Sequence, residues 1–175
     1  MDGGFKKVLL VVIDGLRPDA IRPIEMPTLH ALVPQGWSAS RATTIRPSVT
    51  VAALTSLATG VAPARHGVIN PTLTSLGRLR ELTPMPLALR RRGVPTTVIA
   101  PALGGAARWV AGALLRLGGV DRLDAAADAP ALVLERAADR LAHRVGRELV
   151  VAYVNDTDIA GHAWGWMSPA YLQAA

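Results

Sequence analysis

The chain of 175 residues contains no cysteine. This absence excludes disulfide bonds, thiolate metal ligands and a cysteine nucleophile, and it is typical of a cytoplasmic protein. Aromatic residues are also few, with four tryptophans, two tyrosines and one phenylalanine dispersed along the chain. Rings so scattered form no platform on which nucleic-acid bases could stack. We therefore expect no nucleic acid polymer as a partner.

Long hydrophobic runs are missing too, although half of the residues are hydrophobic. A membrane span needs roughly 18 consecutive apolar residues, and the run Val8–Ile13 already ends at Asp14. No small-residue cleavage site follows, so we expect neither a signal peptide nor a membrane partner. The net charge is +6, but the arginines are scattered. A solvated, arginine-rich surface is the simplest interpretation.

Apolar runs of strand length alternate with longer helical patterns. The expected strands are Val8–Ile13, residues 94–102 and residues 148–156, and the expected helices are Thr28–Val33, Val51–Thr59 and residues 86–93, 105–119 and 129–146. This alternation predicts an α/β fold, with a mostly parallel sheet covered by helices on both faces. Because no repeat, low-complexity tract or linker interrupts it, residues 1–175 are expected to form a single α/β domain.

The first expected strand ends on a charge, because Asp14 and Gly15 follow its apolar run directly. Asp-Gly commonly forms a turn, which is one interpretation. The other is that the strand is a rigid support for a carboxylate in a site, because ligands gather at the carboxyl ends of parallel strands. The choice depends on whether ligand-type residues follow other strands.

Such residues do follow the last expected strand, in the segment "NDTDIAGH". Asp158 and His162 are four positions apart, which places both side chains on one face if the segment is helical. A carboxylate and an imidazole are favoured ligands for zinc and similar ions. Alone, Asp158 could cap a helix and His162 could be an ordinary histidine. Together with Asp14 at another strand end, they favour a metal site.

Thr50 begins the helical pattern after Pro47-Ser48-Val49. Threonine is a good N-cap without any catalytic role. Alternatively, its hydroxyl faces a site where the helix N-terminus favours a phosphoryl anion. A threonine hydroxyl is a poor nucleophile unless deprotonated, and metal coordination is one way to achieve this. Asp14 is the obvious carboxylate to hold such a metal.

The order of these segments resembles the alkaline phosphatase superfamily. Strand-Asp-Gly is followed by "PSVT", then "PARHG", then "D-x-x-G-H". The nearest branch is the type I phosphodiesterase / nucleotide pyrophosphatase group. The resemblance extends from Val8 to about Tyr171, and the motifs occur in the expected order.

The resemblance implies an alkaline-phosphatase-like α/β/α sandwich, truncated, and a metal-dependent hydrolase of phosphate esters. It implies that Thr50 is the nucleophile. Asp14 and Thr50 would share one divalent metal ion, and Asp158 and His162 would hold a second. The ions would be zinc, with manganese as an alternative, and the substrate would be a small-molecule phosphate ester. The residues that bind the rest of the substrate, and the oligomeric state, are left open.

The sequence departs from the family in two respects. An Asp-His pair and a further histidine should complete the ligand set, and nothing after "SPAYLQAA" supplies them. We therefore expect the N-terminal half of a longer catalytic domain, with an open edge strand or an uncovered apolar face. The Pro-Asn-His that usually follows the nucleophile is replaced by Ala52, Ala53 and Leu54, which argues against nucleotide pyrophosphatase activity proper.

Several alternatives stay open. The chain could be an inactive fragment, a non-catalytic metal-binding domain, or a phosphomonoesterase or phosphonate hydrolase of the same superfamily. A hydrolase of the haloacid dehalogenase type also places an aspartate after its first strand, but it needs D-x-D, and Gly15 and Leu16 follow Asp14 here. His66 in "PARHG" is expected to be structural, bonding near the turn at Gly67.

Overall fold

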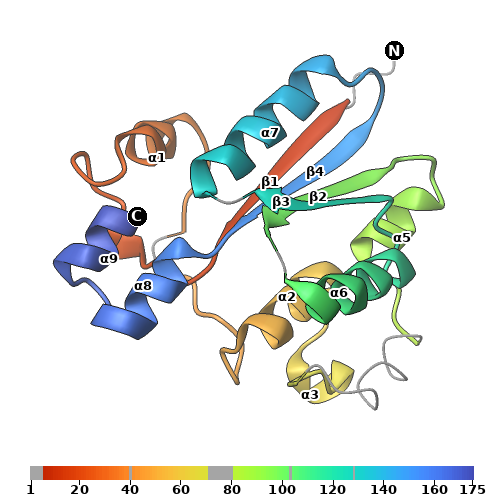
Figure 1. Ribbon diagram of the computed structural model, residues 1–175, viewed down its shortest axis with the longest axis horizontal. Helices are drawn as coiled ribbons and strands as arrows, with labels where there is room; N and C mark the ends of the chain where they lie inside the picture. The colour runs from red at the N-terminus through yellow and green to blue at the C-terminus, as the bar shows by residue number, and fades with distance from the viewer. Residues whose placement is uncertain (1–5, 40, 71–80, 103, 128) are drawn as a thin grey trace. The chain divides into compact units, whose positions relative to one another are not determined.

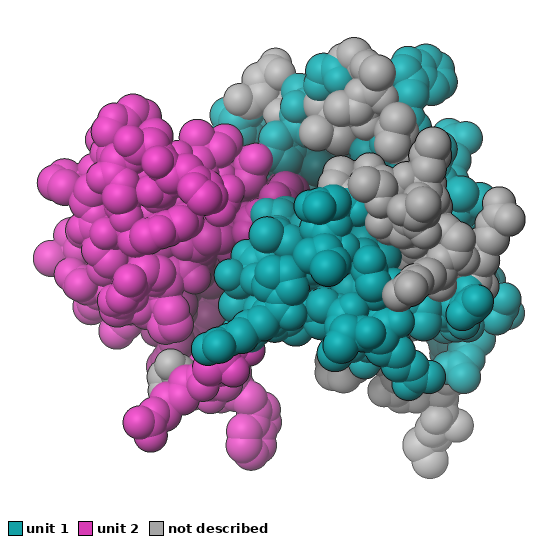
Figure 2. All heavy atoms as spheres, turned by 90° about the horizontal axis from the view of Figure 1, so that it is seen from below, with its two compact units in different colours: residues 1–11, 44–152 teal, residues 12–43, 153–175 magenta. Residues whose placement is uncertain are grey.

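The computed structural model describes residues 6–39, 41–70, 81–102, 104–127 and 129–175. The chain divides into two compact units (Figure 2). The first unit comprises Met1–Val11 and Thr44–Ala152, and the second comprises Val12–Thr43 and Tyr153–Ala175. The expectation of a single domain stays a prediction.

The first unit is built on a four-stranded sheet with the strand order β1-β4-β2-β3. Its strands are β1 (Lys7–Ile13), β2 (Thr96–Pro101), β3 (Arg122–Ala127) and β4 (Glu148–Val154), and the last residues of β1 and β4 belong to the second unit. β2 pairs in parallel with both β3 and β4. The predicted α/β class with a parallel sheet is confirmed.

Helices of the first unit cover the sheet on both faces, as predicted. They are α2 (Thr50–Thr59), α3 (Pro63–His66), α5 (Met85–Arg90), α6 (Gly105–Leu117) and α7 (Pro130–His143). α7 lies on one side of the sheet, and α5 and α6 lie on the other (Figure 1). The central strands are accordingly buried, with Ile99 of β2 and Val150 of β4 at most 2% exposed. Val133 and Ala137 of α7 are fully buried.

Strand β3 is an element that the sequence analysis did not expect. Its segment "RLDAAA" has a low intrinsic preference for strands. Asp121 fixes its start, because the Asp121 N–H donates to Thr96 O at 2.9 Å and Asp121 Oδ2 accepts the Thr96 N–H at 2.8 Å. Pairing with β2 then continues from Thr97 opposite Arg122. Tertiary pairing therefore overrides the local preference.

β1 lies at the other edge of the sheet. Val8, Leu9 and Val11 are 50%, 42% and 39% exposed, although all three are large and apolar. The expected open edge strand is confirmed within the described residues. An exposed apolar edge can pair or pack with another chain.

The second unit has a small core of its own. Its helices are η1 (Pro18–Ala20), α1 (Pro27–Leu32), η2 (Val33–Gln35), α8 (Asp156–Trp164) and α9 (Pro169–Ala174). Ala20, Ala160 and Tyr171 form a buried cluster between η1, α8 and α9. Across the described parts of the chain, no helix has the length and apolar character needed to cross a membrane.

Candidate functional site

Asp14 lies at the carboxyl end of β1, as predicted. Its N–H donates to Val154 O, at the end of β4, at 2.9 Å. Its own carbonyl accepts the Thr157 hydroxyl at 2.5 Å. Asp14 is therefore fixed beside the point where β4 passes into α8, within the second unit.

Asp158 and His162 lie on α8, which confirms that this segment is helical. His162 Nε2 is 3.5 Å from Asp158 Oδ1, so the two side chains share one face. The Asp158 side chain is 27% exposed and that of His162 is 73% exposed. The His162 side chain is thus largely open to solvent, and that of Asp158 is partly buried. The attraction between the two is ionic only when the imidazole is protonated.

Gly15 explains how the turn after Asp14 approaches α8 so closely. It has a φ of +71°, and an added Cβ would lie 2.6 Å from Asp158 Cα. No other residue fits there without moving the helix, because Asp158 Cα is backbone. The glycine therefore brings Asp14 and Asp158 onto neighbouring backbone positions.

Tyr153 is a site residue that the sequence analysis did not identify. Its hydroxyl donates to Asp14 Oδ2 at 2.7 Å. Burial raises the pKa of Tyr153 far above its ordinary value, and the hydrogen bond and the negative charges of Asp14 and Asp158 raise it further. The phenol therefore stays neutral and acts as a donor that orients the carboxylate. A tyrosine one residue before the end of β4 was the available signal.

The loop that follows Asp14 is held by Tyr171 of α9, which is fully buried. The Tyr171 hydroxyl accepts the Arg17 N–H and donates to Gly15 O, both at 2.8 Å. The Trp166 ring packs edge-on against both His162 and Tyr171, with centroid distances of 5.4 and 5.8 Å. These contacts fix the surroundings of the Asp14 turn and of His162.

Thr50 is the first residue of α2 and belongs to the first unit. Val49 occupies the N-cap position, with an extended backbone and no capping side-chain bond. The predicted position in the first helical turn is confirmed.

His66 is fully buried and has a structural role, as predicted. Its Nδ1 accepts the Val68 N–H at 3.0 Å, just past the turn at Gly67, and its Nε2 lies 2.9 Å from Ser56 Oγ. Because a backbone amide can only donate, a neutral His66 carries its proton on Nε2 and donates it to Ser56. The imidazole does not act as a base toward that serine.

The donor chemistry around Asp14 suits a hard or borderline divalent ion. Asp14, Asp158 and His162 offer carboxylate oxygens and an imidazole nitrogen, the ligands that zinc and manganese accept. Within the described residues, however, no three His, Cys, Asp or Glu side chains are grouped closely enough to hold a metal ion. These residues fit the ion in type, and His162 Nε2 lies 3.5 Å from Asp158 Oδ1.

The chain has a parallel α/β sheet with ligand-type residues at the carboxyl ends of two strands, the place where ligands bind in such sheets. Residues 8–79, which include Asp14 and Thr50, match the type I phosphodiesterase / nucleotide pyrophosphatase family. This match confirms the predicted resemblance. No curated protein matches the chain.

Two solved structures of a murine protein share the fold. One is an inactive threonine-to-alanine variant of ectonucleotide pyrophosphatase / phosphodiesterase 5 in complex with AMP, which aligns with a TM-score of 0.74 at 19% identity. The other is the same murine protein, with a TM-score of 0.72 at 19% identity. Both alignments cover 97% of this chain and 48% of the murine chain. The chain therefore has the fold of this group and spans about half the length of the structures it matches.

Proposed function

We propose that this chain carries part of the active site of a metal-dependent phosphoric ester hydrolase, with Thr50 as the nucleophile. The observation that carries the proposal is the site at the end of β1. There Asp14 lies beside the start of α8, which presents Asp158 and His162. The match of residues 8–79 to a phosphodiesterase family supports the reaction class.

Asp14 and Thr50 would hold one divalent ion, and Asp158 and His162 would hold a second. Zinc is the proposed ion and manganese the alternative. When bound, such ions stabilise negative charge on the phosphoryl oxygens. The hydrogen bond from Tyr153 leaves Asp14 Oδ2 oriented, and the neutral phenol adds no competing charge.

In the proposed reaction, the Thr50 hydroxyl passes its proton to solvent, which in turn protonates the leaving oxygen, and Thr50 Oγ attacks phosphorus. A new oxygen–phosphorus bond forms, the bond to the leaving group breaks, and the leaving oxygen is protonated. Water then hydrolyses the phosphothreonine and regenerates the hydroxyl. The position of Thr50 at a helix N-terminus favours this role, because the amide groups and dipole there stabilise a phosphoryl anion.

The proposed substrate is a small phosphodiester. In the murine neighbour, the inactive threonine-to-alanine variant is bound to AMP, which supports a small phosphate-bearing ligand and a threonine-dependent activity. Ala52, Ala53 and Leu54 replace the usual Pro-Asn-His, so a nucleotide pyrophosphate is the less favoured substrate. Phosphomonoesters and phosphonates of the same reaction class are the alternatives.

The test is substitution of Thr50 in a form that contains the complete catalytic domain. Thr50→Ala should abolish hydrolysis of bis-p-nitrophenyl phosphate and leave the metal content nearly unchanged. Thr59→Ala, at the other end of α2, is the matched control and should retain activity. Activity of Thr50→Ala like that of the wild type would remove Thr50 from the mechanism, and a phosphoryl group trapped on Asp14 would favour the haloacid dehalogenase type instead. A parallel assay with p-nitrophenyl phosphate distinguishes diesterase from monoesterase.

A second candidate function is a metal-binding domain without catalysis. The observation behind it is the pair Asp158 and His162, which offers a carboxylate and an imidazole 3.5 Å apart. This chain by itself should then bind zinc weakly and turn over neither substrate. Retention of two zinc ions after dialysis, with robust turnover by a monomer, would exclude this alternative.

A further inference from the structure

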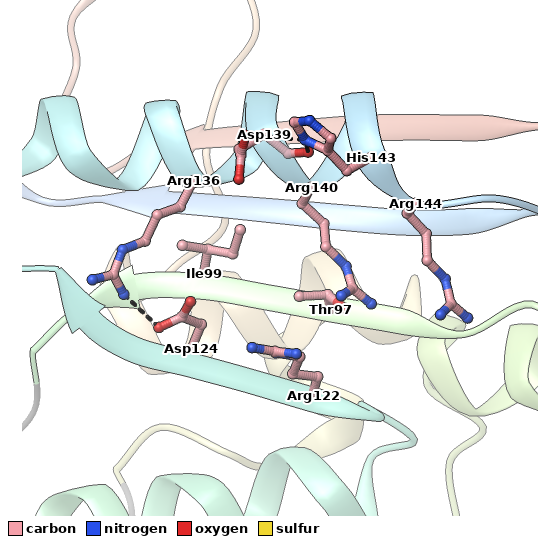
Figure 3. A pocket seen from close by; sticks show the side chains of 9 residues that line it. All are labelled: Thr97, Ile99, Arg122, Asp124, Arg136, Asp139, Arg140, His143 and Arg144. Carbon is pink, nitrogen blue, oxygen red and sulfur yellow. Dashed lines mark hydrogen bonds and ion pairs between the residues drawn. The ribbon is translucent and has the colours of Figure 1, made fainter.

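The first unit contains a cavity of about 370 Å³ between α7 and the strands β2 and β3 (Figure 3). Its volume is within the range of small-molecule sites. The lining is strongly polar, with one aliphatic side chain among residues that are otherwise charged or hydrogen-bonding: Thr97, Ile99, Arg122, Asp124, Arg136, Asp139, Arg140, His143 and Arg144. A ligand of this cavity must therefore be polar.

Two of the four arginines make short hydrogen bonds to carboxylates. Arg136 Nη1 donates to Asp124 Oδ1 at 2.7 Å. Arg140 donates from Nε and Nη2 to Glu148 Oε1, at 3.0 and 2.8 Å. The Thr97 hydroxyl donates to the same oxygen at 2.7 Å. Glu148 has a fully buried side chain, so these bonds to Oε1 offset the cost of burying its charge, whereas Oε2 has no hydrogen-bond partner among the described residues.

The carboxylate of Asp139 does not neutralise the remaining arginines. It lies 3.1 Å from His143 Nδ1 on the same helix, and the two side chains are 75% and 79% exposed. Charges so exposed are screened by solvent and salt. They form the rim of the cavity and contribute little to its potential.

Among the described residues, the other two arginines have no carboxylate within hydrogen-bond distance. Arg144 Nε is 3.9 Å from Glu148 Oε2, an ion-pair distance that is too long for a hydrogen bond. Arg122, at the start of β3, makes no side-chain hydrogen bond or ion pair within the part of the chain that the structure describes. In Figure 3 the side chain of Arg144 extends from the end of α7 toward the strands, and that of Arg122 comes from β3.

We propose that this cavity binds a small polyanion through Arg122 and Arg144. Within the described residues, Arg144 is held only by its long ion pair with Glu148 and Arg122 has no ion pair, so both guanidinium groups can turn toward a ligand. Guanidinium groups match phosphate and carboxylate oxygens with paired hydrogen bonds, and two of them on opposite walls suit a ligand with two anionic groups. The site is separate from the residues of the candidate hydrolase site, so it does not depend on the proposed function.

The test is calorimetric titration of the metal-free chain with pyrophosphate and with citrate, at constant ionic strength in a buffer without phosphate. We expect saturable binding of one ligand per chain. The double variant Arg122→Gln, Arg144→Gln should lose about tenfold or more in affinity, because charge-assisted hydrogen bonds are removed. Tighter pyrophosphate binding would assign a phosphoryl ligand and tighter citrate binding a carboxylate ligand. Saturation by neither overturns the proposal.

Two controls make the result specific. Arg116→Gln removes an exposed arginine of α6 outside the cavity and should leave the affinity for the ligand unchanged. An equal loss of affinity in this variant would mean that net charge alone explains the binding, and it would overturn the proposal. Asp14→Asn tests the candidate hydrolase site, and its binding should equal that of the wild type. Unchanged circular dichroism of the double variant is expected, since neither Arg122 nor Arg144 makes a short ion pair. If the double variant loses binding and its circular dichroism spectrum also changes, the single variant Arg122→Gln is measured instead. The proposal requires that this single variant binds the ligand more weakly than the wild type.

Discussion

The packing of Trp166 on Gly161 gives a sharp test of the surroundings of the candidate site. An added Cβ at Gly161 would lie 1.9 Å from Trp166 Cζ3 and 2.1 Å from Cε3, distances that no side chain tolerates. Gly161 lies inside α8, next to His162. Gly161→Ala must therefore displace the indole ring or the helix, and it should destabilise the second unit.

The expected change in the free energy of unfolding of Gly161→Ala is the sum of two opposing contributions. Replacing glycine by alanine inside a helix stabilises by about 1 kcal/mol. Displacing Trp166 removes its edge contacts with His162 and Tyr171, and aromatic contacts contribute about 0.5–1.5 kcal/mol each. The steric cost is thus about 1–3 kcal/mol, in line with other overpacked sites. The net change should lie between about zero and 2 kcal/mol of destabilisation.

Gly112 of α6 provides the matched control, because an added Cβ there would meet only Leu123 Cδ2 at an ordinary 3.9 Å. Gly112→Ala should stabilise by up to about 1 kcal/mol. Urea unfolding followed by circular dichroism measures both variants, and the difference between them isolates the steric cost of about 1–3 kcal/mol. If Gly161→Ala stabilised the protein as much as Gly112→Ala, the packing of Trp166 on α8 would be refuted.

Three further predictions concern the site and the sheet edge. Because the pKa of Tyr153 is raised on folding, the stability it contributes is complete below its ordinary pKa of about 10 and is lost as the pH rises further. Tyr153→Phe should lower the free energy of unfolding by about 1 kcal/mol at about pH 8. The difference in unfolding free energy between this variant and the wild type should become smaller by about pH 11, and an unchanged difference would contradict the prediction. Leu9→Lys at the β1 edge should reduce self-association in sedimentation velocity, whereas Val145→Lys, also at an exposed position, should not. His162→Gln should lower zinc uptake, measured by elemental analysis, and His30→Gln, an exposed histidine of α1, should not; equal losses would place zinc elsewhere.

The order of short motifs predicted the positions of the candidate residues better than local propensity predicted the sheet. Asp14 ends a strand and His162 shares a helix face with Asp158, as their spacing required. Strand β3 was missed because "RLDAAA" is formed by pairing with β2 and by the anchoring bonds of Asp121, which are contacts between distant segments. No local pattern encodes them.

Tyr153 was missed for a related reason. Its position in β4 is that of an ordinary strand aromatic, and only the adjacency of β1 and β4 brings its hydroxyl to Asp14. The sequence could indicate that both strands exist but not that they are neighbours. The predicted nucleophile, metal ions and metal ligands stay predictions, because they concern chemistry that side-chain positions alone do not establish.

The charge at the end of the most apolar strand has a physical explanation in Gly15. An Asp-Gly turn at the surface would need glycine only for its positive φ. Here glycine is required for a second reason. A Cβ at position 15 would lie 2.6 Å from Asp158 Cα, so any side chain would clash with the start of α8. A simple turn has no need for that second constraint. A site that uses residues from the ends of both β1 and β4 would need it, and this supports the proposed role of Asp14 as a ligand.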